Sequence, residues 1–277
     1  MTNSDLNNLL LLAIQSAFIA GKIIMQVYGN DHLIIKIKKD FSPLTLADQS
    51  ANEVLMTYLE KTQIPVISEE GKQYEYAIRQ NWEFFWLIDP LDGTKEFLGR
   101  NGEFTVNTAL INKNLPIIGV VYAPASGHLY YGSPDIGAYL LSTSGFKTDI
   151  PADMPQIIRL SEKLPFRTDR VHYTIVSSRS HVNFETQRYI QMLKKRYGKT
   201  QVISKGSSLK FCLVAEGSAD IYPRFGPTME WDTAAGQAVA VHSGCNVIRY
   251  DTGDVLAYNK KDLRNPWFIV NRDSHHS

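Results

Sequence analysis

Cysteine is scarce in this chain of 277 residues, where Cys212 and Cys245 are the two examples. Two cysteines do not form the spaced set that builds a disulfide framework. We expect both to be reduced, in a reducing compartment, although a single disulfide remains an alternative. The cytoplasm is therefore the predicted location.

The N-terminus lacks the features of a targeting or membrane segment. Its apolar patch, residues 9–14, is preceded by Asp5 and followed by Gln15 and Ser16. It has no basic region with a small-residue cleavage site, and no apolar run approaches the roughly 18 residues that span a bilayer. We expect no integral membrane segment. Peripheral association with the cytoplasmic face of the inner membrane stays open, because a protein of that kind would have the same sequence features.

A charge excess is also missing, because 29 Lys and Arg side chains face 28 Asp and Glu side chains, for a net charge of +1. Such a balance gives no whole-molecule attraction to nucleic-acid polymers or anionic membranes. The expected partner is a small molecule. Monomer and homodimer both stay open.

Motifs for covalent or zinc-dependent hydrolysis are absent as well. The seven histidines show no HExxH spacing, and Ser126-Gly127 lacks the context of a nucleophile elbow. These absences disfavour a covalent serine route and direct attention to the acidic residues.

Hydrophobic periodicity predicts a mixed α/β (α+β) protein. Ser4 is a candidate cap for a first helix that ends near Gly29. The remaining predictions are helices at 46–61, 184–195, 209–216 and 233–243, and strands at 33–38, 65–67, 86–88, 105–112, 117–122, 128–132, 173–177, 201–203 and 219–222. The segment 143–170 has three prolines and is predicted to lack regular structure, so a boundary is placed there, between parts 1–150 and 151–277.

The stretch WLIDPLDGTKEF, residues 86–97, places two aspartates where an apolar strand is expected to stop. Pro90 cannot donate to a sheet ladder, and Gly93 allows a sharp turn, so Asp89 and Asp92 are expected to face one small space. Two carboxylates this close repel unless a proton or a cation lies between them. An oxygen-only site favours Mg²⁺, with Mn²⁺ as a substitute. The alternative is an ordinary Asp-Gly turn.

Acidic residues recur at the ends of other predicted elements. Glu69 and Glu70 follow the strand at 65–67, Asp48 begins a helix, and Asp232 opens another. Each alone is more typical of a cap or a surface charge. Their recurrence favours a shared metal site.

Four segments together resemble the signatures of the inositol monophosphatase superfamily: SPLTLAD at 42–48, SEE at 68–70, DPLDGT at 89–94 and WDTAAG at 231–236. The resemblance covers most of the chain. It implies a layered αβαβα sandwich, with an N-terminal α+β part that carries most metal ligands and a C-terminal α/β part that carries Asp232 and the substrate pocket.

The resemblance also implies residue roles. Glu69, Asp89 and the Leu91 carbonyl would hold one Mg²⁺, and Asp89, Asp92 and Asp232 a second. Asp48 and Thr94 would orient and deprotonate the attacking water, and the N–H groups of Gly93 and Thr94 would hold a phosphate. Glu70 would tune the site or be a solvated charge. Inhibition by lithium is expected as a family trait.

Residues 206–236 resemble the bisphosphate nucleotidase branch of that superfamily. Ser207, Ser208, Lys210 and Arg224, close to Asp232, would suit a second phosphate, since an Arg side chain can grip phosphate oxygens bidentately. Alternatively, Lys210 lies on an exposed helix face and Arg224 is a loop charge. Ser178 and His181 would line the ribose or base pocket, or cap a helix.

The expected function is Mg²⁺-dependent conversion of adenosine 3',5'-bisphosphate to AMP and phosphate, in sulfur assimilation or nucleotide recycling. 3'-Phosphoadenylyl sulfate is a second expected substrate. One alternative is a phosphatase of inositol phosphate or another sugar phosphate. Another is a non-catalytic, nucleotide- or RNA-associated regulator, which the intact set of acidic residues argues against.

Overall fold

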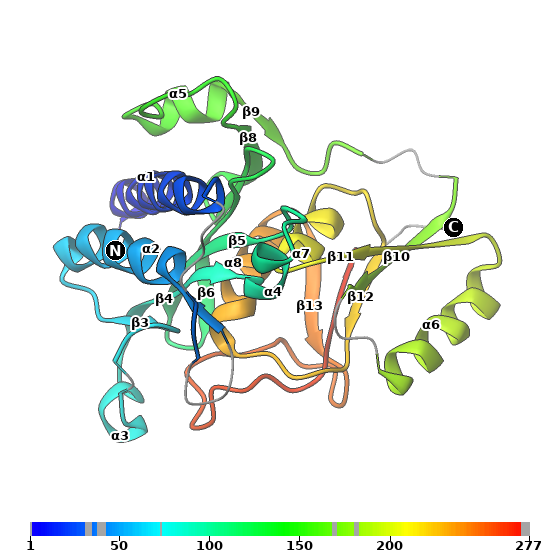
Figure 1. The fold of residues 1–277 in the computed structure, drawn as a ribbon. Coiled ribbons are helices and arrows are strands. Elements are labelled where there is room, and N and C mark those ends of the chain that lie inside the picture. The colour runs from blue at the N-terminus through cyan, green and yellow to red at the C-terminus, as the bar shows by residue number, and fades with distance from the viewer. Residues whose placement is uncertain are drawn as a thin grey trace.

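A computed structural model describes residues 2–30, 35–37, 43–72, 74–167, 171–179 and 183–272. Its helices and strands form five layers, in the order helices, sheet, helices, sheet, helix (Figure 1). This is the αβαβα sandwich that the resemblance implied.

The first layer consists of α1 (Asn3–Tyr28) and α2 (Leu46–Leu59), which pack against one another and against one face of the larger sheet. The apolar residues of α1 recur at helical spacing and are buried, among them Leu10, Ala13, Ile14 and Ala17. A short hairpin of β1 (Ile35–Ile37) and β2 (Pro43–Thr45) lies between the two helices in the chain, and a 3₁₀ turn, Glu60–Thr62, follows α2.

The cap of α1 differs from the prediction, because Thr2 and not Ser4 is the N-cap. The Thr2 hydroxyl accepts a hydrogen bond from the Asp5 N–H at 3.3 Å, and the Asp5 carboxylate accepts one from the Thr2 N–H at 2.7 Å. This reciprocal pair satisfies two helix-end donors at once, so the helix starts earlier. Its predicted end at Gly29 is confirmed.

By length and composition alone, α1 could cross a membrane, with a mean hydropathy of 1.8 over its most apolar window. Half of that window is buried inside the protein, however. Its apolar face covers the sheet, as expected of a core helix.

The larger sheet has seven strands in the order β3-β4-β5-β6-β7-β8-β9, antiparallel except for the parallel pair β3–β4. The strands are β3 (Val66–Ser68), β4 (Phe84–Asp92), β5 (Thr105–Asn112), β6 (Leu115–Ala123), β7 (His128–Ser133), β8 (Gly137–Ser142) and β9 (Ser161–Lys163). The short α3 (Tyr76–Arg79) precedes β4, and α4 (Thr94–Leu98) follows it.

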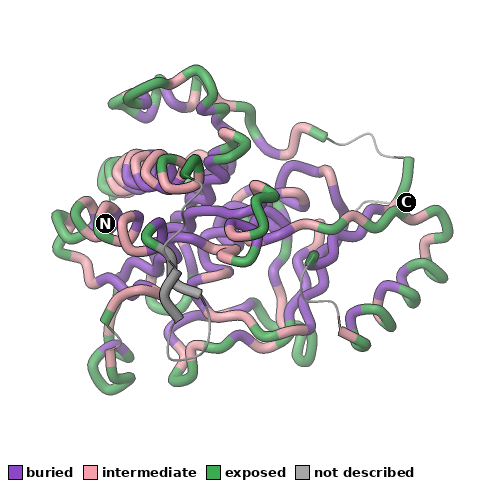
Figure 2. Tube along the Cα trace, in the orientation of Figure 1, coloured by how far each residue is buried: buried purple, intermediate pink, exposed green. Residues whose placement is uncertain are grey.

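The smaller sheet has five strands in the order β11-β10-β12-β14-β13. They are β10 (Tyr173–Ser178), β11 (Thr200–Lys205), β12 (Ile221–Arg224), β13 (Cys245–Arg249) and β14 (Phe268–Arg272). Helix α6 (Phe184–Tyr197) packs on its outer face. In Figure 2 the outer side of α6 is exposed, whereas the strands of the central layers are mostly buried.

Helices α7 (Leu209–Ala215) and α8 (Glu230–His242) fill the layer between the sheets. Helix α8 approaches β6 so closely that a Cβ on Gly119 would lie 2.3 Å from the Ala235 carbonyl oxygen. Glycine at position 119 is therefore what lets this helix lie flat on the sheet.

Within the segment 143–170, the described residues 143–167 are more ordered than predicted. They contain α5 (Met154–Arg159), capped by the Asp153 carboxylate, and strand β9, which pairs with β8 and so extends the larger sheet beyond residue 150. Prolines misled the prediction, because Pro155 lies in the first turn of α5, where proline is tolerated. The division of the chain near residue 150 stays a prediction.

Candidate active site

A cavity of about 320 Å³ lies where β4, α4, α7, β12 and α8 converge. Its lining brings together segments more than 160 residues apart in the sequence. The lining includes Glu69, Asp89, Leu91, Asp92, Gly93, Thr94, Ser178, Ser207, Lys210, Arg224 and Asp232. Most of the predicted site residues therefore share one enclosed space.

Strand β4 does not stop at Asp89, as predicted, but continues to Asp92. Asp89 pairs with Asn107 and Asp92 with Thr105, and the register is irregular between the two aspartates. Pro90 cannot donate a ladder hydrogen bond, so the strand bulges instead of ending. Both Asp89 and Asp92 line the cavity as a result.

Three carboxylates form the acidic end of the cavity. One oxygen each of Glu69, Asp89 and Asp232 lies within 4.8 Å of the others. Burial raises the pKa of Asp89 well above its usual range, and the charges of Glu69, Asp92, Asp232 and Asp48 raise it further. Such a group stabilises a cation placed between its members.

Asp92 lies in the same cavity, and two hydrogen bonds fix the orientation of its side chain. Its Oδ2 accepts from the Ser208 hydroxyl at 2.9 Å and from Asn107 Nδ2 at 3.4 Å. Burial raises the pKa of Asp92, while the Lys210 charge and these two hydrogen bonds oppose the rise. The carboxylate is thus oriented before any ligand arrives.

Asp232 is fixed by the start of α8. Its Oδ2 accepts from the Met229 N–H at 2.8 Å, which satisfies a free donor at the helix N-terminus. Burial and the charge of Asp92 raise its pKa well above the usual range.

Two cationic side chains, Lys210 and Arg224, line the same cavity, and this part is called its cationic end. Lys210 and Arg224 are 6% and 8% exposed. The alternative, in which Lys210 is an exposed helix charge and Arg224 a loop charge, is therefore wrong, because both side chains are buried. Arg224 Nη2 donates to the Pro227 carbonyl at 2.8 Å, and Lys210 Nζ donates to the Ser207 carbonyl. Burial lowers the pKa of Lys210 to about 8, against the opposing charge of Asp92.

Two polar atoms at this end, Arg224 Nε and Ser207 Oγ, are buried and lack a hydrogen-bond partner within the described part of the chain. Unpaired buried donors cost free energy and are uncommon in folded proteins. Both residues line the cavity, but the two atoms themselves are almost fully covered, so a ligand would reach them only with a local shift of the side chains.

The remaining predicted residues take varied positions. Asp48 is buried at the start of α2, close enough for its charge to act on Asp89. Ser208 is buried behind Asp92, and Ser178 lines the cavity. Glu70 follows β3 in a half-buried turn and is not among the lining residues described. His181 lies outside the described residues.

Asn107 was not predicted from the sequence, and its Nδ2 also donates to the Ser208 hydroxyl at 2.8 Å. The sequence did offer an indication, namely a polar amide in the middle of the predicted strand TVNTALIN, and the structure shows that this amide is buried. Its position opposite Asp89 depends on strand pairing, however, and local sequence does not show that pairing.

The donors at the acidic end fit a hard divalent cation. They are carboxylate oxygens, with no His or Cys in the group that the structure describes. Oxygen ligands of this kind suit Mg²⁺, Mn²⁺ or Ca²⁺ better than zinc. The mutual repulsion of the carboxylates makes a bound cation favourable.

Residues 5–276 match the inositol monophosphatase family. A 3'(2'),5'-bisphosphate nucleotidase CysQ of Salmonella typhimurium is 44% identical over 255 residues, which cover 91% of this chain and 94% of that protein. A CysQ of Escherichia coli K12 is likewise 44% identical, with the same coverage. The chain therefore belongs to the inositol monophosphatase family, whose enzymes are generally metal-dependent.

Solved structures agree with this assignment. The crystal structure of CysQ from Bacteroides thetaiotaomicron superposes with a TM-score of 0.90 at 46% identity, covering 99% of this chain and all of that one. An inositol monophosphatase from Anabaena shares the fold, with a TM-score of 0.68 at 22% identity over 98% of this chain and 93% of its own.

Proposed function

We propose that this protein is a magnesium-dependent phosphatase that converts adenosine 3',5'-bisphosphate to AMP and phosphate. 3'-Phosphoadenylyl sulfate is a second substrate in this proposal, because it carries the same 3'-phosphate. The proposal is supported by the relatives named 3'(2'),5'-bisphosphate nucleotidase, at 44% identity over 91% of the chain. It is also supported by the chemistry of the cavity.

One observation carries the choice of a bisphosphate: the cavity is lined by a group of carboxylates and, beside it, by two cationic side chains. The acidic end, Glu69, Asp89 and Asp232, suits a metal ion. The other end offers Lys210 together with the unpartnered Arg224 Nε and Ser207 Oγ. A substrate with a scissile phosphate at the metal end and a second phosphate at the cationic end would satisfy both.

The metal ligands in this proposal are Glu69, Asp89, Asp92, Asp232 and the carbonyl of Leu91, all of which line the cavity. Two or more Mg²⁺ ions are proposed, with Mn²⁺ as a substitute. When bound, divalent ions of this kind neutralise phosphoryl oxygens and lower the pKa of water.

The chain's own groups would orient the reaction. Asp48 would accept the proton of the attacking water, with the Thr94 hydroxyl as its orienting partner. The N–H groups of Gly93 and Thr94, at the turn after β4, would hold the scissile phosphate. Lys210 and Arg224 would hold the second phosphate and so fix which ester bond faces the acidic residues.

A comparison of kcat/KM for adenosine 3',5'-bisphosphate, adenosine 3'-monophosphate and inositol 1-phosphate, each with Mg²⁺ and with EDTA, tests the proposal. We expect the bisphosphate to be preferred and phosphate release to stop in EDTA. A higher kcat/KM for inositol 1-phosphate than for the bisphosphate would show that the cationic end does not bind a second phosphate. Binding of the nucleotide without Mg²⁺-dependent phosphate release would indicate a regulator instead.

The cytoplasmic location and a monomeric or homodimeric state stay predictions. Gel filtration of the purified protein and fractionation of cells would test them directly.

A further inference from the structure

Glu103 lies outside the catalytic cavity, in the short connection between α4 and β5, where the two sheets meet. It is 9% exposed. Its carboxylate accepts from Arg179 Nε and Nη2, both at 2.8 Å, from Lys205 Nζ at 3.2 Å and from the Gly206 N–H at 2.8 Å. One carboxylate next to the larger sheet thus binds three residues of the smaller sheet's part of the molecule, two of which are adjacent in sequence.

Gly206 lines the cavity, and Arg179 and Lys205 are each the chain neighbour of a lining residue. Arg179 directly follows Ser178, the last residue of β10, and Lys205 is the last residue of β11. Gly206 and Ser178 themselves line the cavity. Glu103 therefore acts on the wall of the site and not on a remote surface.

The backbone around Gly206 has no spare room. A Cβ at position 206 would lie 2.7 Å from Glu96 Cγ and 2.8 Å from the Glu103 carbonyl oxygen. The Glu103 carbonyl oxygen is also 3.2 Å from where a Cβ of Gly93 would lie, and Gly93 has a φ of +90°. Glu103 is thus packed between the turn after β4 and the segment before α7.

The segment that Glu103 holds, residues 205–210, delivers the groups proposed to bind the second phosphate. Ser207 has a left-handed φ of 44°, which turns the chain sharply between Gly206 and α7. The buried Oγ of Ser207 and the Lys210 side chain follow within four residues. A shift of Gly206 would move both.

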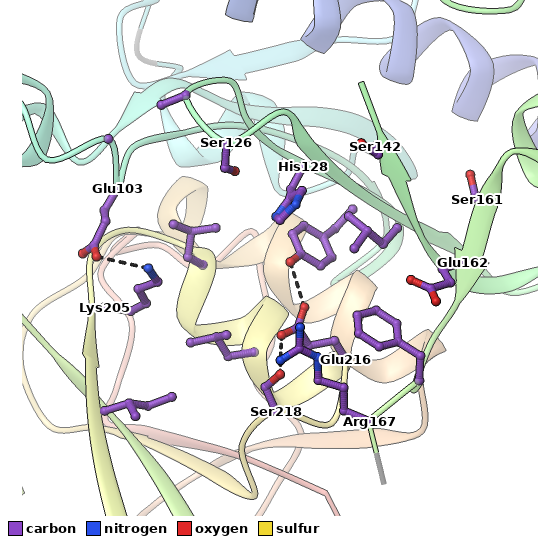
Figure 3. A pocket seen from close by; sticks show the side chains of 18 of the residues that line it. Glu103, Ser126, His128, Ser142, Ser161, Glu162, Arg167, Lys205, Glu216 and Ser218 are labelled. Atoms are coloured by element: carbon purple, nitrogen blue, oxygen red, sulfur yellow. Dashed lines mark hydrogen bonds and ion pairs between the residues drawn. The ribbon is translucent and has the colours of Figure 1, made fainter. Parts of the chain in front are cut away.

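On its far side, Glu103 borders a second, larger groove of about 1040 Å³ between the two sheets. Figure 3 shows Glu103 and Lys205 joined at the edge of this groove. The Arg179 and Lys205 side chains are 46% and 38% exposed, so water screens these ion pairs and limits their effect on stability. Their directed hydrogen bonds still fix geometry.

We propose that Glu103 is a positioning residue that holds the 205–210 segment in place for the second phosphate of the substrate. It acts through Gly206 and touches no reacting atom. The inference rests on the proposed function, because it assigns Glu103 to the specificity of the same site.

The Glu103→Gln variant tests the inference. The variant keeps the shape of the side chain but removes its charge, which weakens the hydrogen bonds from Arg179, Lys205 and Gly206. We expect KM for adenosine 3',5'-bisphosphate to rise about tenfold, while KM for adenosine 3'-monophosphate and kcat for both change less than about threefold. A purely structural role would affect the two substrates in parallel.

Asp251→Asn is the matched control, because it breaks an exposed bidentate pair with Arg249, at 3.0 and 2.7 Å, away from the cavity. It should leave both KM values unchanged. Arg179→Met, which removes the donor and keeps Glu103, should reproduce the selective rise in KM, and this second variant decides the matter if Glu103→Gln does not fold.

Parallel changes for both substrates, or no change in either variant, would overturn the inference while leaving the proposed function standing. A wild-type protein that does not prefer the bisphosphate to the monophosphate would overturn the proposed function, and the inference with it. The wild-type measurement therefore separates the two failures.

Discussion

The Ser208 hydroxyl lies 2.9 Å from Asp92 Oδ2 and 2.7 Å from the carbonyl oxygen of Asp232. Asp92 ends a strand of the larger sheet, whereas Asp232 belongs to α8, so this single hydroxyl connects the two elements that carry these aspartates. Ser208→Ala would leave both acceptors without that donor. We expect kcat to fall about tenfold or more with little change in KM, since the effect falls on the carboxylates and not on the cationic end. Steady-state kinetics with the bisphosphate measure this, and Ser144→Ala on an exposed loop serves as the control.

Replacement of Asp89 by Asn should abolish turnover and yet stabilise the protein in EDTA. The buried Asp89 carboxylate is repelled by Glu69, Asp92, Asp232 and Asp48, and the neutral amide removes that repulsion. We expect the melting temperature in EDTA to rise by a few degrees, corresponding to about 1 kcal/mol.

The same variant should gain little stability from added Mg²⁺, whereas the wild type should gain several degrees, because a ligand stabilises the state that binds it. Thermal unfolding with and without Mg²⁺ checks both outcomes. Equal Mg²⁺-dependent stabilisation of the two proteins would contradict the assignment of Asp89 as a ligand.

Because the pKa of Glu103 is lowered in the folded protein, we expect this residue to make the free energy of unfolding depend on pH. Its pKa is about 2 in the folded protein, against 4.5 for an ordinary glutamate, because the hydrogen bonds from Arg179, Gly206 and Lys205 outweigh the effect of burial. A carboxylate with a lowered pKa stabilises the fold above pH 4.5, and this contribution is lost as the pH falls toward 2. After allowance for solvent screening, we expect Glu103→Gln to cost about 1 to 2 kcal/mol at pH 7. Urea unfolding should show the gap between wild type and variant narrowing below about pH 5; a constant gap would mean that the charge is not responsible.

The ion pair between the buried Glu230 and the partly buried Lys260 should cost more stability when Lys260 alone is replaced than when both charges are removed. Glu230 is fully buried at the start of α8, and its Oε1 accepts from Lys260 Nζ at 2.6 Å and from the Lys260 N–H at 3.0 Å. Lys260→Met would leave this carboxylate without its charge partner and should cost about 3 to 5 kcal/mol. The double variant with Glu230→Gln should recover part of that loss. Urea unfolding of the wild type, the two single variants and the double variant gives a double-mutant cycle. Strictly additive changes in the free energy of unfolding would show that the two side chains are not coupled.

Gly119 tests the contact between α8 and the larger sheet. A Cβ at Gly119 would meet the Ala235 carbonyl at 2.3 Å and the Ala238 Cβ at 2.6 Å, and neither neighbour can rotate away. We expect Gly119→Ala to destabilise the protein by about 3 kcal/mol. Gly145, which has nothing within 4 Å of an added Cβ, gives the matched control, and Gly145→Ala should change stability by less than about 1 kcal/mol.

The sequence predicted the local elements well where periodicity and turn residues agreed. The strand expected at 105–112 is β5, Thr105–Asn112, and the helix expected at 209–216 is α7 with one residue fewer. Strands β8, β13 and β14 were not predicted, because each depends on pairing with neighbouring strands that the local sequence does not show.

Candidate site residues were predictable where a motif marked them, as for Asp89, Asp92 and Asp232, which the structure brings to one cavity. Asn107, Glu103 and Glu230 were not predicted. Their roles depend on which strand lies beside which, and on a carboxylate meeting donors 76 to 103 residues away, as for Glu103. Long-range pairing of this kind leaves no local pattern.

Helix α8 is wedged between the two sheets and also carries Asp232, so the packing of the hydrophobic layers and the assembly of the acidic end occur together. A chain in which the larger sheet or α8 had not formed would lack Asp89 or Asp232 at its proper place. Catalytic activity should therefore report on the integrity of the whole molecule: in a denaturant titration, its loss should coincide with the change in tryptophan fluorescence rather than precede it.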